Sequence, residues 1–204
     1  MKEFGIVIFV LVGLVVLSGK LIAKEEVMDE KWAVATFAGG CFWCMEPPYD
    51  KLEGVKETIV GYMGGHTKNP TYQEVSAGTT GHAEVIQVVY DPSVVSYEKL
   101  VDTFWRNINP IQVEGQFADT GTQYRTAIFY HDEEQKKIAE ASKKALEESG
   151  KYQQPIATEV VPATEFYRGE EYHQNYYQKN STHYQIYSVG SGRKDYLKKM
   201  WDKK

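Results

Sequence analysis

Hydrophobic and β-branched residues are grouped along the chain in short segments, and the spacing within each segment indicates its structure. Residues 32–40 (WAVATFAGG) have the nearly unbroken apolar pattern of a buried strand that ends in two glycines. The β-branched segments 55–63 and 83–91 predict two further strands. Residues 124–131 (YRTAIFYH) predict another strand later in the chain.

Two segments between these strands predict helices. Residues 41–54 (CFWCMEPPYDKLEG) are interpreted as a helix that starts at the cysteines, is disturbed by Pro47 and Pro48, and is closed by Gly54. Residues 96–107 (SYEKLVDTFWRN) predict a second helix, which begins at a serine N-cap and carries its apolar residues on one face.

The predicted order is strand, helix, strand, strand, helix, strand. This is the order of the ferredoxin-like fold, in which helices cover one face of an antiparallel sheet. We therefore expect an α/β protein built as an α+β two-layer sandwich. Residues 132–150 predict an appended amphipathic helix, and residues 156–163 predict one more strand. From Phe166 onward the chain is rich in tyrosine and shows no clear periodicity, so a coil that packs over the core is expected there.

Two long polar loops interrupt this pattern, over residues 64–82 and 108–123. Loops of this length are uncommon in a compact domain and tend to carry function. The functional residues are therefore expected to include some from these loops.

A separate apolar segment precedes the predicted domain. The uncharged run over residues 4–19 is short for a membrane-spanning helix, which needs about 20 apolar residues, and its length suits the core of a signal peptide. Residues 1–23 are therefore expected to be a signal peptide, with an uncleaved N-terminal anchor as the alternative, and residues 24–31 a polar linker. This predicts an exported protein, periplasmic or extracytoplasmic, with a single domain over residues 32–204.

Charge and cysteine content narrow the function. The net charge of −5, without a basic stripe interleaved with aromatic residues, argues against nucleic-acid binding. The two cysteines of the chain, Cys41 and Cys44, lie so close together that a disulfide between them would add little stability. Five histidines without close spacing, and no second cysteine pair, are a poor ligand set, so no metal is expected.

A redox role suits the position of the cysteine pair. Cys41 lies at the predicted start of a helix, where the helix dipole is expected to lower the pKa of its thiol. Gly39 and Gly40 allow the backbone to turn and leave the sulfur accessible. The candidate classes are a thiol enzyme with an apolar aromatic pocket, a general thiol-disulfide oxidoreductase, and a non-enzymatic redox-sensing or methionine-binding module.

Several segments of the chain resemble a known family. GCFW after the first strand, GYMGG, NPTYQEV, GHAEVIQVVYDP, the FW pair of the second helix and GTQYRTAIFY match, in order and spacing, the signature segments of peptide methionine sulfoxide reductase A. The resemblance covers about residues 33–187. It implies a ferredoxin-like core with a tail wrapped over it, and an enzyme without a cofactor that reduces methionine-S-sulfoxide in oxidised proteins and as the free amino acid.

The resemblance also implies roles for individual residues. Cys41 is expected to be the nucleophile, which becomes a sulfenic acid as methionine is released. Phe42 and Trp43 are expected to lie against the S-methyl group of the substrate. These two aromatic residues would account for the unusual spacer of the cysteine pair.

The sulfoxide oxygen needs a proton, because oxide is a very poor leaving group. The resemblance implies Glu84 as the acid, and a carboxyl beside aromatic rings should have a raised pKa. Tyr72 and Tyr124 are expected to donate hydrogen bonds to the oxygen, and Asp119 to help hold the substrate backbone. His173 resembles a recurrent family position and is expected to have a structural, hydrogen-bonding role.

The chain departs from the family pattern in its recycling cysteine. Many members recycle the sulfenic acid with cysteines near the C-terminus, and this chain has none there. We therefore expect Cys44 to be the resolving thiol, which forms a Cys41–Cys44 disulfide that an external thioredoxin-like dithiol reduces. The alternative is that Cys44 is a buried inert residue and that the reductant attacks the sulfenic acid directly. A monomer is expected.

Overall fold

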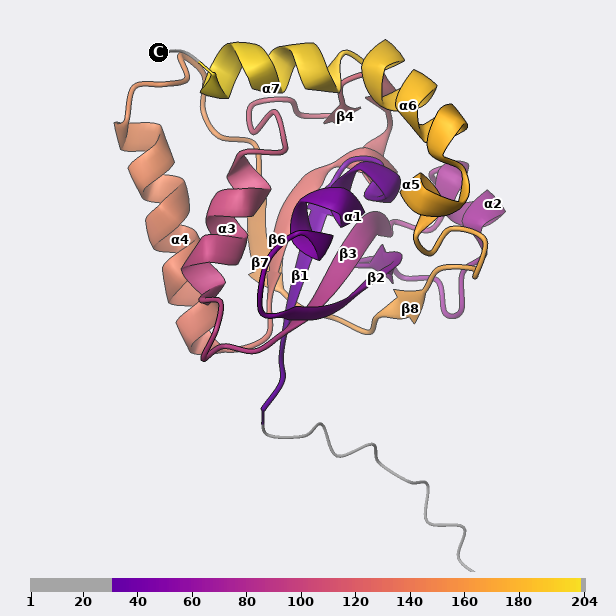
Figure 1. Cartoon of the computed structure of the whole chain (residues 1–204), viewed down its shortest axis with the longest axis horizontal. Helices are drawn as coiled ribbons and strands as arrows, with labels where there is room; N and C mark the ends of the chain where they lie inside the picture. Colours follow the sequence, from indigo (N-terminus) through magenta and orange to yellow (C-terminus); the bar gives the residue numbers. More distant parts are fainter. Residues whose placement is uncertain (1–30, 203–204) are drawn as a thin grey trace, which may run out of the picture.

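The computed structural model describes residues 31–202, which fold around a six-stranded sheet (Figure 1). Its strands are β1 (Ala33–Gly39), β2 (Val55–Met63), β3 (Ala83–Tyr90), β6 (Thr126–Tyr130), β7 (Glu159–Pro162) and β8 (Tyr167–Arg168). Their order is β7-β6-β1-β3-β2-β8. The inner four pair antiparallel in the order of the ferredoxin-like fold, and β7 joins β6 in parallel. The predicted fold class is confirmed.

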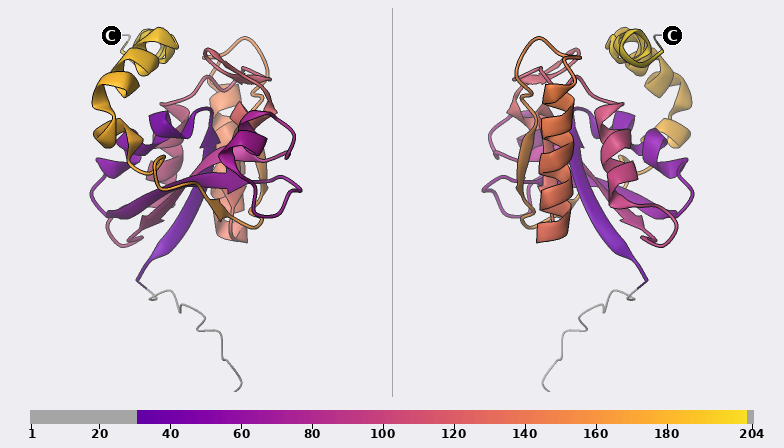
Figure 2. Two further views of the ribbon diagram at one scale, coloured as in Figure 1. Left: turned by 90° about the vertical axis from the view of Figure 1, so that its right-hand side faces the viewer. Right: turned by 90° about the vertical axis from the view of Figure 1, so that its left-hand side faces the viewer.

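Helices cover one face of this sheet (Figures 1 and 2). They are α1 (Phe42–Asp50), α3 (Tyr97–Trp105) and α4 (Glu133–Glu148). Side chains alternate between the two faces of a strand, so Phe37, Ile86 and Ile128 share the face that packs with Leu100 and Phe104 of α3. This cluster is the main hydrophobic core, and it holds α1 against the sheet.

The observed helix boundaries lie close to the predicted ones. Ser96 caps α3 and Asp132 caps α4, each accepting a hydrogen bond from the backbone N–H three residues later. α1 continues through Pro47 and Pro48 but ends before the predicted closure at Gly54. Both prolines are thus accommodated inside α1, which ends at Asp50.

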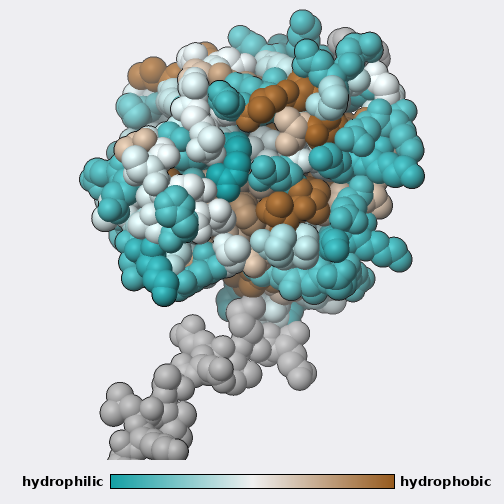
Figure 3. All heavy atoms as spheres, turned by 180° about the vertical axis from the view of Figure 1, so that it is seen from behind, coloured by the Kyte–Doolittle hydropathy of each residue, from teal (hydrophilic) through white to brown (hydrophobic). Residues whose placement is uncertain are grey.

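The opposite face of the sheet carries a second, smaller hydrophobic cluster. Ala38, Met63, Val85 and Phe129 are buried in it, and Phe166 packs against them from the C-terminal segment. Seen from behind, the surface is mostly hydrophilic, with hydrophobic residues in separate small areas (Figure 3). On this side the described residues leave no continuous hydrophobic face.

The first long loop contains a short helix. Within residues 64–82, α2 (Tyr72–Ser76) begins with a capping box, in which Thr71 and Glu74 each accept a hydrogen bond from the other's backbone N–H. The sequence carries this signal, since the threonine is followed three residues later by glutamate. The loop prediction missed it because the helix is short and has one buried residue.

The second long loop also contains short regular elements. Within residues 108–123, β4 (Gly115–Gln116) and β5 (Asp119–Thr120) pair as a two-stranded ribbon. A 3-10 helix follows over Thr122–Tyr124. The next strand therefore begins later than predicted, at Thr126.

The C-terminal segment wraps over the core, but the expected coil is wrong. It forms α5 (Tyr176–Lys179), α6 (Ser181–Gly190) and α7 (Arg193–Trp201), which lie over the end of the sheet where β1 leads into α1 (Figure 1). The usual start signals of a helix are missing, because the N-cap residues Asn180 and Gly192 make no side-chain capping bond. One residue of α6 is buried, so no periodic apolar face marks this helix in the sequence.

The predicted signal peptide or anchor over residues 1–23 lies outside the described residues. Among the helices of residues 31–202, none combines the length and the hydrophobicity that a membrane span requires.

Candidate active site

The turn between β1 and α1 places both cysteines at the start of the helix. Gly40 has a φ of +80°, and a Cβ atom added to it would lie 2.4 Å from the Cβ of Gln116, so a larger residue does not fit. Cys41 is the N-cap residue of α1, and its carbonyl accepts a hydrogen bond from the N–H of Cys44 at 3.1 Å. Both cysteines are buried. The predicted position of the pair is confirmed.

Cys41 faces a small cavity that brings together most of the predicted site residues. Its volume is about 110 Å³. It is lined by Cys41, Phe42, Trp43, Tyr72, Glu84, Asp119, Tyr124 and Tyr187. Seven of these residues were predicted, and the fold gathers them from α1, α2, β3, β5 and the 3-10 turn. Cys44 does not line this cavity, and Tyr187 was not predicted.

Glu84 is a buried carboxyl near the start of β3, with 2% of its surface exposed. Its Oε2 accepts a hydrogen bond from the N–H of Phe42 at 3.0 Å, which ties it to the first turn of α1. Burial raises the pKa of Glu84 to about 8, although the hydrogen bond from Phe42 opposes this effect. Glu84 is therefore mostly protonated at neutral pH, as the sequence predicts.

Two tyrosine hydroxyls join Glu84 at the cavity. Tyr72 is the first residue of α2, and its backbone N–H donates to Oε1 of Glu170 at 2.8 Å. Burial raises the pKa of Tyr72 to about 12 and raises the pKa of Tyr124 as well, with the charge of Glu84 as the second cause in both. Both hydroxyls therefore keep their protons and are available as hydrogen-bond donors.

Trp43 lines the cavity, and two residues outside the cavity hold its ring in place. Its indole N–H donates to Nδ1 of His173 at 3.0 Å, and its ring stacks on Tyr176 with centroids 3.8 Å apart. His173 is buried, and burial lowers its pKa, so the neutral ring can accept this bond. The structure thus gives His173 the structural hydrogen bond that was expected of it.

Tyr187 of α6 is the cavity residue that sequence patterns did not indicate. Its hydroxyl donates to Oδ2 of Asp119, and the same hydroxyl interacts with the thiol of Cys41. Burial raises the pKa of Asp119, although the bond from Tyr187 opposes the rise. The one signal for Tyr187 in the sequence was the tyrosine excess of the tail, because α6 shows no apolar period.

The whole described domain matches known proteins. The family model for peptide methionine sulfoxide reductase matches residues 33–204. The chain belongs to this family. A peptide methionine sulfoxide reductase MsrA of Bacillus velezensis is 55% identical over 174 residues, which cover 85% of this chain and 98% of the relative.

Solved structures of the same family share the fold. Methionine sulfoxide reductase A of Corynebacterium diphtheriae has a TM-score of 0.67 at 36% identity, over 75% of this chain and 77% of that chain. Mxr1 from Saccharomyces cerevisiae in complex with Trx2 has a TM-score of 0.50 at 29% identity, over 75% of this chain and 91% of that chain. The protein is therefore a peptide-methionine sulfoxide reductase, as its motifs predict. The two alternatives, a general thiol-disulfide oxidoreductase and a non-enzymatic module, are set aside.

The two free thiols of this reductase differ in acidity. Burial raises the pKa of Cys41 well above its ordinary value, and the hydrogen bond with Cys44 adds to the rise. The predicted lowering of this pKa is wrong, because burial is the largest effect on the thiol of Cys41. The hydrogen bond from Cys41 lowers the pKa of Cys44 to about 7. Cys44 is thus the more acidic thiol of the resting pair.

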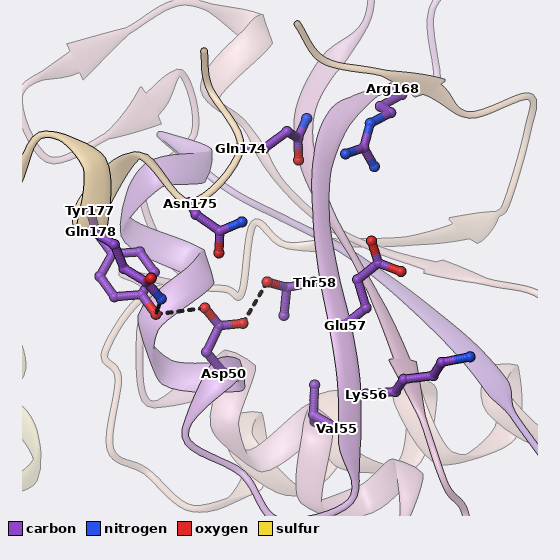
Figure 4. A pocket seen from close by; sticks show the side chains of 10 residues that line it. All are labelled: Asp50, Val55, Lys56, Glu57, Thr58, Arg168, Gln174, Asn175, Tyr177 and Gln178. Carbon is purple, nitrogen blue, oxygen red and sulfur yellow. Dashed lines mark hydrogen bonds between the residues drawn. The ribbon is translucent and has the colours of Figure 1, made fainter. Parts of the chain in front are cut away.

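A larger hollow of the described domain lies away from the cysteines, beside β2, α1 and α5 (Figure 4). Its volume is about 370 Å³. The carboxylate of Asp50 accepts hydrogen bonds there from Thr58 at 2.5 Å and Tyr177 at 2.7 Å. These bonds join three elements, so this polar hollow has a structural explanation. Within residues 31–202, no group of three His, Cys, Asp or Glu side chains is placed to hold a metal ion.

Proposed function

We propose that this reductase acts on the S epimer of methionine sulfoxide, in oxidised proteins and as the free amino acid, with Cys41 as its nucleophile. The observation that carries the proposal is one cavity of about 110 Å³ that Cys41 shares with Glu84, Tyr72 and Tyr124. A sulfoxide oxygen bound there meets three protonated donors. Such donors withdraw electron density from the sulfoxide sulfur and prepare it for attack.

The first chemical step moves oxygen from the substrate to the enzyme. The sulfur of Cys41 attacks the sulfoxide sulfur while Glu84 protonates the oxygen. In the adduct the sulfur–oxygen bond of the substrate and the bond between the two sulfurs then break. The hydroxyl group bonds to the sulfur of Cys41, which becomes a sulfenic acid, and methionine leaves with the two electrons. Because burial keeps Cys41 protonated at rest, its proton must leave as the attack proceeds, and the Glu84 carboxylate that has given its own proton to the oxygen accepts it.

Substrate placement depends on the other residues that line the cavity. Phe42 and Trp43 offer apolar surface to the S-methyl group, and the fixed orientation of the Trp43 ring supports this role. Asp119 offers a carboxylate that can accept from a backbone N–H of the substrate. Its bond from Tyr187 holds it in position for this contact.

Cys44 is proposed to regenerate the enzyme. Its thiolate attacks the sulfur of the Cys41 sulfenic acid, which forms a disulfide and releases water. An external thioredoxin-like dithiol then reduces this disulfide. The yeast relative Mxr1 in complex with Trx2 supports a partner of this kind. Both cysteines lie at the first turn of α1, where the N–H of Cys44 donates to the carbonyl of Cys41 at 3.1 Å, and this closeness supports a disulfide between them.

Separated epimers test the substrate proposal directly. Wild-type enzyme supplied with the S and R sulfoxides of a methionine peptide should reduce the S form to completion and leave the R form unchanged. Chiral chromatography of the remaining sulfoxide measures both. Equal consumption of the two epimers would contradict the proposed stereochemistry.

A Cys44→Ser variant should separate reduction from regeneration. It should release one methionine per enzyme at a rate close to that of wild type, because Cys44 does not line the substrate cavity. Turnover with thioredoxin should fall by at least about tenfold, because no disulfide forms for the dithiol to reduce. Methionine is counted per enzyme with and without thioredoxin. Full turnover of the variant with thioredoxin would show that Cys44 is an inert residue.

Export and a monomeric state are also proposed. The apolar segment over residues 4–19 supports export, although it lies outside the described residues. The proposed catalytic residues Cys41, Glu84, Tyr72 and Tyr124 line one cavity within a single chain, so catalysis needs no residue from a second copy. Cell fractionation and light scattering of the purified protein test the two statements.

A further inference from the structure

A buried arginine lies beside the cysteine pair. Arg193 is the first residue of α7, and 5% of its surface is exposed. Its guanidinium donates to the carbonyl of Gly39 at 2.8 Å and to the carbonyl of Asn107 at 2.7 Å, and it lies 4.6 Å from the ring centroid of Phe117. These contacts fix α7 to the residues directly before Cys41.

The charge of Arg193 lowers the pKa of Asp119, but the two groups form no direct ion pair. Among residues 31–202, no Asp or Glu forms an ion pair with it. A buried cation surrounded by neutral oxygen atoms is destabilising unless a nearby group supplies negative charge. The structure therefore raises the question of which group does so.

Cys44 lies next to this charge. Arg193 and Cys44 line a cavity of about 230 Å³ that is separate from the substrate cavity, since neither residue lines the latter. The positive charge of Arg193 lowers the pKa of Cys44, after the larger effect of the hydrogen bond from Cys41. A thiolate on Cys44 would therefore face a buried cation.

The titratable and charged groups around Cys44 come from several elements. They are Cys41, Lys51 after α1, Asp119 of β5, Tyr184 of α6, and Arg193 and Lys194 of α7. The two lysines are exposed, so water and salt screen their charges. Asp119 opposes a negative charge on Cys44, but its carboxylate is engaged by Tyr187. Arg193 is the buried cation of this set.

We propose that Arg193 is a positioning residue for regeneration, which holds Cys44 as a thiolate ready to attack oxidised Cys41. The proposal rests on the proposed function, in which Cys44 resolves the sulfenic acid. In that step the Cys44 thiolate forms a bond to the sulfur of Cys41. The sulfur–oxygen bond of the sulfenic acid breaks, and the leaving hydroxide takes a proton from Glu84 and departs as water.

The test follows disulfide formation separately from methionine release. Enzyme is mixed with one equivalent of methionine-S-sulfoxide without reductant, and the reaction is quenched at intervals. Intact-mass measurement distinguishes the sulfenic acid from the disulfide, because they differ by one water. Methionine released in the same samples reports the first step, which depends on the substrate cavity.

Arg193→Gln should slow disulfide formation at pH 7 by about fivefold, because a rise of about one unit in the pKa of Cys44 from about 7 lowers its thiolate fraction by that factor. The rate should recover at pH 9, where Cys44 ionises without help. Arg193→Lys keeps the charge and should stay within about threefold of wild type at pH 7. Methionine release in the first turnover should change less than disulfide formation in both variants.

Arg106→Gln is the matched control. Arg106 packs on Trp201 at the far end of α7, 4.7 Å from the ring centroid, and does not line the cavity of Cys44. It should leave the rate of disulfide formation unchanged. A similar slowing in this control would mean that loosening α7, and not the charge of Arg193, causes the effect.

Three other results would overturn the inference. They are an unchanged rate in Arg193→Gln at pH 7, a loss that pH 9 does not restore, and an equal loss in Arg193→Lys. If wild type forms no disulfide at all, the proposed role of Cys44 fails together with the inference. If only the inferred role of Arg193 is wrong, wild type still forms the disulfide, so the two failures are distinguishable.

Discussion

A Cys41→Ser variant should release no methionine, even in a single turnover at high enzyme concentration. A serine hydroxyl is a far weaker nucleophile toward sulfur than a thiol, and no second sulfur lines the substrate cavity. The expected loss is at least about a thousandfold, which brings the rate to background. Quenched samples analysed for free methionine over hours measure it.

The matched control for this variant is the substitution of the other cysteine. Cys44→Ser removes the other thiol and should keep its single turnover, so the pair of variants distinguishes the nucleophile from the resolving residue. Circular dichroism should show that Cys41→Ser keeps its fold, because serine is close in size and can occupy the N-cap position of α1. Stoichiometric methionine release by Cys41→Ser would refute the assignment.

The sequence predicted the substrate cavity well because its residues lie in local motifs. Glu84 opens a strand, Tyr72 opens a capped helix, and Phe42 and Trp43 follow a glycine turn. These local signals carry the family resemblance. Tyr187 was missed because its place at the cavity depends on its contacts with Asp119 of β5 and Trp43 of α1, which are tertiary contacts without a local signal.

The acidity of the cysteine pair could not be predicted from the chain. The start of a helix favours a thiolate at Cys41, but burial opposes it and is the largest effect on this thiol. Arg193 lies 149 positions after Cys44 in the chain, yet it shares a cavity with that residue. Both effects depend on the packing of α6 and α7, which the sequence pattern indicated as coil.

A Glu84→Gln variant should release methionine in the first turnover about 10²–10⁴ times more slowly than wild type, the usual contribution of a general acid. Glutamine matches the size of Glu84, and its carbonyl can still accept the hydrogen bond from Phe42. Its amide can donate to the sulfoxide oxygen but cannot transfer a proton. A rate within about threefold of wild type would exclude Glu84 as the acid.

The pH dependence of the first-turnover rate is an independent test of Glu84 as the acid. Burial raises the pKa of Glu84 to about 8, so the acid is lost as pH rises through this value. Because burial raises the pKa of Cys41 well above its ordinary value, its thiolate keeps increasing with pH, so the wild-type rate should rise up to about pH 8 and then level off. Glu84→Gln should lack this levelling-off and continue to rise up to pH 10. Single-turnover rates from pH 6 to pH 10 measure both profiles.

The same substitution should stabilise the protein at high pH. Burial raises the pKa of Glu84 from 4.5 to about 8, so the folded state holds this proton more tightly than the unfolded state between these values. The free energy of unfolding of wild type therefore decreases, through this group, as pH rises from about 4.5 to about 8. Glutamine does not titrate, so the stability of Glu84→Gln relative to wild type should increase across this range and level off above it.

Urea unfolding of both proteins at pH 5 and pH 9 measures the difference in the free energy of unfolding. An equal difference at the two pH values would mean that Glu84 is not a buried acid. A residue whose removal improves stability while abolishing the proton transfer is retained for its chemistry.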